Sequence, residues 1–199
     1  MNLLKLAPTL LIGLLAACAS PSPAPVLLTL PPAAATAAVA PVAAASAPVL
    51  AVRRVNIPEY LVARRVRYRA DASTLAEWPN TYWAERIEIG VSREFMSALR
   101  QQLPGWELCE STCGDQVPSL ALQVELVPMD FVRSTQRLQA RARATVSSVG
   151  AAPRTLQTRE WDYALPASAD TAQAQAQAVT ELIRQVAAAT APIIRAAQP

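Results

Sequence analysis

Residues 120–126 are Leu-Ala-Leu-Gln-Val-Glu-Leu, and residues 138–146 are Leu-Gln-Ala-Arg-Ala-Arg-Ala-Thr-Val. Apolar and polar side chains alternate in both stretches, which is typical of strands with one buried and one solvated face. A third strand is predicted over about 155–165. Because the connections between the three strands are short, they should pair as an antiparallel meander. The small alanines of the middle strand would let a helix approach the sheet closely.

Two amphipathic helices are predicted beside this meander. The first covers about 82–103, where apolar residues recur every four positions, and Pro104 follows it. The second should begin with Asp170 and Gln173 as a capping pair, and Pro192 should kink or end it. Its apolar stripe has helical spacing and consists of Val179, Leu182, Ile183, Val186, Ala187 and Thr190.

Further strands are predicted upstream, over 50–57 and 64–69, with 73–78 as the hairpin partner of the latter. Strands with one apolar face and helices with one apolar stripe bury these surfaces against each other. The pattern therefore predicts one α+β domain of two layers, a mainly antiparallel sheet with two amphipathic helices on one face.

The composition excludes several kinds of chemistry. The 199 residues include no histidine, which removes histidine general bases, Ser-His-Asp and Cys-His systems, and imidazole metal sites. Only five glycines are present, and none belongs to a dinucleotide-binding or P-loop motif. We therefore expect a protein that is not an enzyme and that holds no cofactor or metal. Its role would be binding, structural or in trafficking.

The N-terminus predicts export and lipidation. A basic start with Lys5 precedes the uncharged run 7–17, which resembles a secretory signal and is shorter than the roughly 20 apolar residues of a transmembrane helix. The run ends Leu-Ala-Ala before Cys18, which looks like a bacterial lipobox. This predicts removal of residues 1–17 and acylation of Cys18. The alternative is an ordinary signal peptide, cut at Ala-x-Ala, with an incidental cysteine.

The mature chain would begin with a lipidated tether over 18–25. Loss of Lys5, the only lysine, would lower the net charge from +3 to +2, which is too mild for a nucleic-acid binder. Residues 33–48 are almost entirely alanine, proline and valine, with no periodic apolar face. Such composition predicts an extended, mobile segment. Composition alone assigns all of 26–48 to the tail.

Two other cysteines, Cys109 and Cys113, lie close together in the chain. The oxidising compartment of an exported protein favours a local disulfide between them. A metal site and a redox-active pair are the alternatives. Two thiolates without histidine leave a zinc site short of ligands, and the spacing differs from Cys-x-x-Cys.

The densest basic stretch includes Arg65, Arg67 and Arg69, which alternate along one predicted strand. Guanidinium groups bind phosphate in a bidentate manner, so these residues could form a surface for anions or for an acidic partner. Alternatively, they form a solvated strand face with local acidic partners that discourages edge association. Arg141 and Arg143 have the same two interpretations.

Aromatic and acidic residues also admit two interpretations. Trp78, Tyr82 and Trp83 crowd the predicted start of the first helix, where they could anchor a partner or pack the helix on the sheet. Glu160 and Asp162 share one strand face, but nothing else supports a paired-carboxylate hydrolase.

Three motifs resemble the PqiC-type auxiliary lipoproteins of ABC-type transport systems. Residues 28–30, Leu-Thr-Leu, resemble the family's Tyr-Thr-Leu strand, and residues 55–61, Val-Asn-Ile-Pro-Glu-Tyr-Leu, resemble its Val-x-Leu-Pro-x-Tyr-Leu segment. Residues 83–87, Trp-Ala-Glu-Arg-Ile, resemble its Trp-Ala-Glu-Pro-Leu, with Arg86 in place of proline. The order of the meander and the C-terminal helix also agrees, so the resemblance covers about 26–195.

The resemblance implies a domain over 26–199, with 26–30 as its first strand and 33–48 as a loop within it. It implies a non-catalytic lipoprotein on the periplasmic face of the outer membrane. Ser20 stands where an aspartate would retain a lipoprotein in the inner membrane. The implied partner is an MCE-domain membrane protein of the same lipid transport system, and a homo-oligomer is left open. The alternative function is an assembly or piloting lipoprotein for an outer-membrane barrel or a secretin.

Overall fold

The computed structural model describes residues 23–32, 47–110 and 113–198. The predicted signal peptide, Cys18 and residues 33–46 of the predicted loop lie outside the described residues. The strands and helices, in chain order, are β1 Val26–Leu28, β2 Val49–Val52, a short 3-10 helix Glu59–Leu61, β3 Arg65–Arg69, β4 Leu75–Trp83, α1 Ile87–Gln102, β5 Glu107–Glu110, β6 Leu120–Val132, a second 3-10 helix Arg133–Thr135, β7 Arg137–Ser148, β8 Thr155–Pro166 and α2 Ala172–Ala196.

The long strand β6 organises the sheet. β7 pairs antiparallel with β6, and β8 pairs antiparallel with β7, so the predicted meander is confirmed. The β6–β7 register shifts between Leu126 and Met129, which places Pro128 in a bulge within a continuous strand.

The opposite edge of β6 pairs with two shorter strands in parallel. β2 runs along its first half, and Arg69 of β3 faces Val132 near its end. β5 extends the sheet in parallel from β2, while β4 pairs antiparallel with β3 and carries β1 in parallel. The α+β class is confirmed, and the described sheet combines three antiparallel pairings with four shorter parallel ones.

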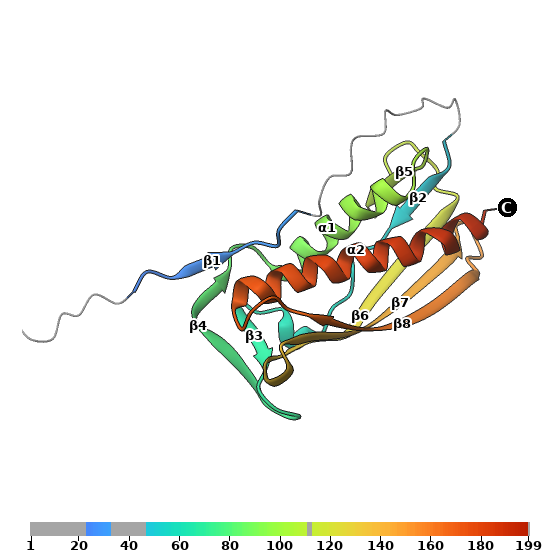
Figure 1. The fold of residues 1–199 in the computed structure, drawn as a ribbon. Helices are drawn as coiled ribbons and strands as arrows, with labels where there is room; N and C mark the ends of the chain where they lie inside the picture. The colour runs from blue at the N-terminus through green and yellow to red at the C-terminus, as the bar shows by residue number, and fades with distance from the viewer. Residues whose placement is uncertain (1–22, 33–46, 111–112, 199) are drawn as a thin grey trace, which may run out of the picture.

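Both helices cover one face of the sheet (Figure 1). The predicted apolar stripe of α1 is buried, including Val91, Phe95 and Leu99. α2 packs over β7, whose Ala142 and Ala144 side chains are fully buried. Alanines on both surfaces keep the side chains short, so the helix can approach the strand closely.

The first helix begins later than predicted. β4 passes through Pro79 and Asn80, where a hairpin strand had been expected to end, and continues to Trp83. Asn80 adopts a left-handed backbone conformation with φ of 48°, which asparagine tolerates better than most residues. Trp83 is consequently a buried strand residue, and α1 starts at Ile87.

The strand predicted over 50–57 is shorter, and β5 was missed by the sequence pattern. β2 ends at Val52, although the Arg53 and Asn56 amides still donate to Leu122 and Val124 carbonyls of β6 at 2.9 Å. Among the described residues β5 pairs only with β2, so its pairing is set by a distant segment rather than by its own alternation.

The start and end of α2 also differ from the prediction. Thr171 is the N-cap, and its Oγ1 accepts a hydrogen bond from the Ala174 amide at 3.2 Å. Asp170 instead pairs with Arg133 at 2.9 Å. Pro192 lies inside the helix, which continues to Ala196. A proline so close to the end removes one backbone donor without ending the element.

Candidate functional site

Two motifs that are distant in the sequence meet at the N-terminal end of α1. Segment 55–61 runs beside β6, and segment 83–87 links β4 to the helix. Ser92 joins segment 55–61 to the first turn of α1, because its Oγ accepts from the Val55 amide at 3.1 Å and donates to the Glu88 carbonyl at 2.7 Å. This junction fixes the helix terminus against the sheet.

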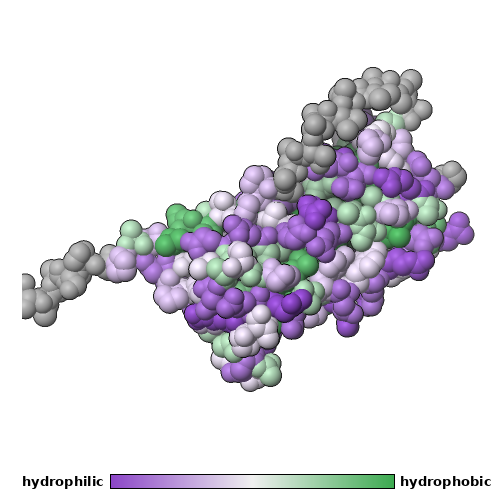
Figure 2. Space-filling model, viewed as in Figure 1, coloured by the Kyte–Doolittle hydropathy of each residue, from purple (hydrophilic) through white to green (hydrophobic). Residues whose placement is uncertain are grey.

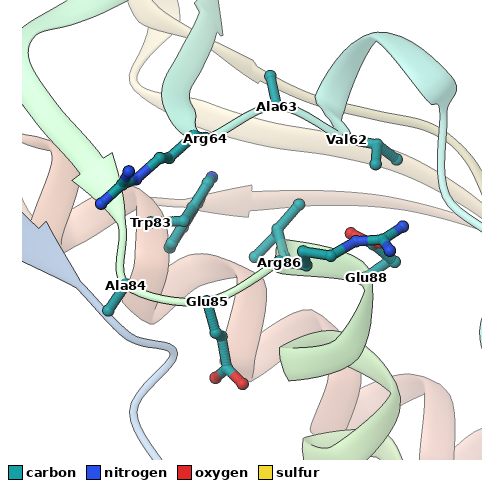
Figure 3. Close-up of a pocket in the computed structure, with 9 residues that line it drawn as sticks. Val62, Ala63, Arg64, Trp83, Ala84, Glu85, Arg86 and Glu88 are labelled. Carbon is teal, nitrogen blue, oxygen red and sulfur yellow. The ribbon is translucent and has the colours of Figure 1, made fainter.

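A cleft of about 390 Å³ opens at this junction (Figure 3). Its walls combine apolar groups with charged residues at the rim, and they comprise Val62, Ala63, Arg64, Trp83, Ala84, Glu85, Arg86, Ile87 and Glu88. A second hollow of about 330 Å³ continues past Arg86 and Glu88 toward Val55 and Glu59. We call the two together the α1 cleft.

Arg86 and Glu88 separate the two hollows. Their side chains form an ion pair, and Figure 3 shows the guanidinium lying against the carboxylate. Glu88 is only 7% exposed, and neither of its oxygens has a hydrogen bond of good geometry among the described residues. The Arg86 side chain is 67% exposed, so a surface group shields a buried acid. A buried carboxylate needs compensation, which Arg86 supplies through charge alone.

A polar network joins segment 55–61 to two strands of the sheet. Asp130 is buried, and it accepts from the Tyr60 hydroxyl and from Arg69 Nε, each at 2.9 Å. Burial and the contact with Asp130 raise the pKa of Tyr60 above its usual value. The hydrogen bond to Asp130 likewise raises the pKa of Arg69. The network therefore ties segment 55–61 to β3 and β6.

The arginines predicted as an anion surface are engaged within the domain. Arg65 and Arg67 both pair with Glu77 at 3.3 Å, and Arg69 pairs with Asp130 at 2.9 Å. Arg67 also donates to the Tyr60 carbonyl at 2.8 Å. Of the three, Arg65 keeps the most exposed side chain, at 48%. The geometry favours the interpretation as a strand face with local acidic partners.

The aromatic residues divide into core and surface. Trp78 and Trp83 are buried, and Trp78 stacks on Tyr68 with ring centres 4.9 Å apart. Tyr82 is half-buried, and it carries the guanidinium groups of Arg64 and Arg65 over its ring at 6.0 and 5.2 Å. The two tryptophans therefore pack the sheet, while Tyr82 faces outward.

The acids on β8 have arginine partners on β7. Arg141 donates to Asp162 at 2.8 Å, and Arg143 donates to Glu160 at 2.6 Å. These cross-strand pairs are exposed, so they stabilise the sheet only weakly. The pairing accounts for both carboxylates without a catalytic role.

Cys109 and Cys113 are joined by a disulfide in the structure, with their Cα atoms 5.2 Å apart. The bond follows β5, which lies beside the C-terminal end of α1 (Figure 1). Cys18 lies outside the described residues.

The pair Arg86–Glu88 was not predicted from the sequence. An acid in the first turn of a helix is a common stabilising feature, so Glu88 gives no signal by itself. The one hint is Arg86, which replaces the proline of the motif and supplies the charge beside the buried acid.

Another groove, of about 650 Å³, shares Arg54 with the second hollow of the α1 cleft and extends to the β7–β8 hairpin. It is lined by Arg53, Arg54 and the β7–β8 hairpin around Gly150. Within residues 23–32, 47–110 and 113–198, no group of three or more acidic or cysteine side chains could hold a metal ion. No helix in this part of the chain is long and apolar enough to cross a membrane.

Solved structures share this fold. One, described as an uncharacterized protein, has a TM-score of 0.69 and 17% identity, over 86% of this chain and 99% of its own. Another, a Xanthomonas campestris protein of the DUF330 family, has a TM-score of 0.61 and 15% identity, over 82% and 91% of the two chains. No curated protein matches the sequence.

A family model covers nearly the whole described domain. It matches residues 28–191, from the end of β1 to the last turns of α2, and its description is an ABC-type transport auxiliary lipoprotein component. The match includes both segments that form the α1 cleft. The chain therefore belongs to the family of ABC-type transport auxiliary lipoprotein components.

Proposed function

We propose that this protein is a non-catalytic outer-membrane lipoprotein that faces the periplasm and serves an MCE-type intermembrane lipid transport system. The observation that carries the proposal is the family match over 28–191, taken with the lipobox that ends at Cys18. The family supplies the link to a transport system and to lipidation. The outer membrane, the lipid cargo and the MCE partner are the further steps of the proposal.

The α1 cleft is the proposed docking site for the membrane-anchored partner. Two of the three motifs that carry the family resemblance contribute to its lining, and its apolar walls with charged rims suit a protein segment. Glu88 and Glu85 of the cleft are engaged by Arg86 and Arg93, the latter 2.7 Å from Glu85, so we expect these acids to serve recognition rather than acid–base chemistry.

The anchor is tested by mass spectrometry of the membrane-extracted protein. The intact mass should exceed that of residues 18–199 by a diacylglycerol and an acyl chain. Cys18→Ala should abolish both the added mass and the membrane association. An unmodified product with another N-terminus would contradict the proposal.

The partner is tested by affinity capture of the full lipidated protein from outer and inner membranes. Recovery of an MCE-domain protein supports the proposal, whereas a barrel or a secretin supports the piloting alternative. Ala84→Trp should fill the α1 cleft and reduce recovery at least several-fold. Ala152→Trp, an exposed alanine of the β7–β8 hairpin, is the matched control and should retain it. Equal recovery with both variants would move the docking site elsewhere.

A further inference from the structure

The N-terminal segment leaves the domain at a fixed place. Asn80 Nδ2 donates to the carbonyls of Pro23 and Ala24 at 2.7 and 2.9 Å, immediately before β1. Residues 19–22 alone separate Cys18 from Pro23. At about 3.3–3.6 Å per residue, this stretch spans at most about 18 Å. A lipid on Cys18 would therefore hold the β1 edge close to the membrane.

The domain is longer than this reach. α2 has 25 residues, which is about 37 Å at a rise of 1.5 Å per residue. It begins near β3, where Gln175 donates to the Arg67 carbonyl, and its last turn reaches the end of α1, where Arg195 donates to the Gln102 carbonyl. β1 and the C-terminus lie at opposite ends of the molecule (Figure 1).

The surface at the exit point has an unusual composition for an edge strand. Val26 and Leu27 are 41% and 55% exposed, and Figure 2 shows apolar residues gathered over β1. Leu27 is in register with Tyr82, which is in register with Arg65 on the next strand. Arg64 also lies over the Tyr82 ring and forms no ion pair among the described residues. We call Leu27, Tyr82 and Arg64 the membrane face, with Val26 beside them at the strand edge. Arg65 is held by Glu77 and is not counted in this face.

We propose that the membrane face rests on the phospholipid headgroups of the membrane that holds the anchor. Exposed aliphatic side chains can enter the headgroup region, tyrosine favours the interface, and arginine binds phosphate. A single arginine adds only modestly to binding at an anionic surface, so the face assists an anchor rather than replacing it. The opposite end, which carries the β7–β8 hairpin, then points into the periplasm (Figure 1). This inference rests on the lipid anchor of the proposed function, and not on the identity of the partner.

Depth-dependent quenching tests this orientation in the full lipidated chain. Lipidation and the disulfide occupy the three native cysteines, so a fluorophore can be placed on Leu27→Cys or, as the control at the far end, on Val149→Cys. Proteoliposomes contain phosphatidylethanolamine and phosphatidylglycerol with a headgroup spin label. Strong quenching at position 27 and little at position 149 is the expected result. Equal quenching at both positions, or stronger quenching at 149, would overturn the proposal.

A second comparison separates the surface from the tether. A Gly/Ser insertion after Ser22 that doubles the tether reach should leave position 27 quenched in anionic vesicles, if the face itself binds. To test the face itself, the fluorophore is placed on Ala24→Cys, and Leu27→Ser is combined with Arg64→Glu in the same chain. Quenching of the label at position 24 should then fall to the level seen at position 149. Val149→Ser with Arg154→Glu, at the far end, is the matched control and should leave quenching unchanged.

Mass spectrometry of the same samples separates the two proposals. Absent lipid contradicts the proposed function, whereas lipidated protein with an unquenched label contradicts only this inference.

Discussion

At the residue scale, one buried amide connects the helix layer to the sheet. Gln175 of α2 is 5% exposed. Its Oε1 accepts from Trp78 Nε1 at 2.7 Å, and its Nε2 donates to the Arg67 carbonyl at 2.7 Å. Both partners belong to the sheet beside the α1 cleft. The amide therefore satisfies two buried groups that would otherwise lack a partner.

Gln175→Ala should lower the free energy of unfolding by about 1–3 kcal/mol, because it leaves the Trp78 donor and the Arg67 acceptor unpaired. Chemical denaturation followed by tryptophan fluorescence measures the change. Gln177→Ala, on the exposed side of the same helix, is the control and should change stability by less than about 0.5 kcal/mol. Similar losses for both variants would show that helix propensity, rather than the buried bonds, decides the effect.

At the element scale, the contact between α2 and β7 depends on small side chains. Ala142 and Ala144 are fully buried under the helix, and Ala187 of α2 is fully buried as well. Interiors are packed densely, so added methylene groups must displace neighbours. The alanines of β7 are therefore required for packing, because larger side chains at these positions would push α2 away from the sheet.

Ala142→Leu should destabilise the domain by about 1–3 kcal/mol through overpacking. Ala164→Leu on the neighbouring strand β8 is exposed and should be nearly neutral. Thermal unfolding of the two variants, compared at the same pH, provides the measurement. A neutral Ala142→Leu would indicate that α2 can move away from the sheet without cost.

The disulfide after β5 should contribute modestly to stability, because it closes a loop of only a few residues. Chain-entropy arguments give about 2 kcal/mol for such a loop. The double variant Cys109→Ala/Cys113→Ala should lose about this amount relative to the oxidised protein, and should equal the reduced wild type. Free thiols in exported protein under non-reducing alkylation would contradict the bond.

At the scale of the whole molecule, residues 26–30 and residues 33–46 should contribute differently to the free energy of unfolding. Leu28 and Leu30 are buried at 9% and 4% exposure, and the Ala84 amide donates to the Leu28 carbonyl at 2.8 Å. Pro31 accepts from Thr180, midway along α2, while Pro48 accepts from Glu107 near the far end. Half the length of α2 separates Pro31 from Pro48, which at a rise of 1.5 Å per residue is on the order of 20 Å.

Replacing 33–46 with about eight Gly/Ser residues would bridge that span, since such a stretch reaches about 26 Å. The free energy of unfolding should change by less than about 1 kcal/mol, because loop-closure entropy varies slowly with length. Deleting 26–30 should instead cost about 1.5–3 kcal/mol for each buried leucine and expose the β4 edge. Hydrogen exchange and denaturation measure both effects. Equal losses would mean that 33–46 carries packing of its own.

The local pattern was sufficient to predict the meander and the buried faces of both helices. The alternation over 120–126 and 138–146 indicates strands with one buried face. Short connections allow such strands to pair only with their neighbours in the chain, in antiparallel orientation. The stripe from Val91 to Leu99 likewise determines which side of α1 is buried. The motifs at 55–61 and 83–87 indicated the family that the domain match confirms.

The amino-acid sequence alone thus determined the class of fold, the spacing of apolar residues in each amphipathic element, and the family. Tertiary structure decided the rest, because parallel pairing, buried caps and clefts depend on segments that are distant in the chain. β5 becomes a strand only beside β2, and β4 passes Pro79 because Asn80 adopts φ of 48° and binds the segment before β1. Glu88 is an ordinary first-turn acid in the sequence. It becomes the centre of the α1 cleft only where folding buries it and Arg86 covers its charge.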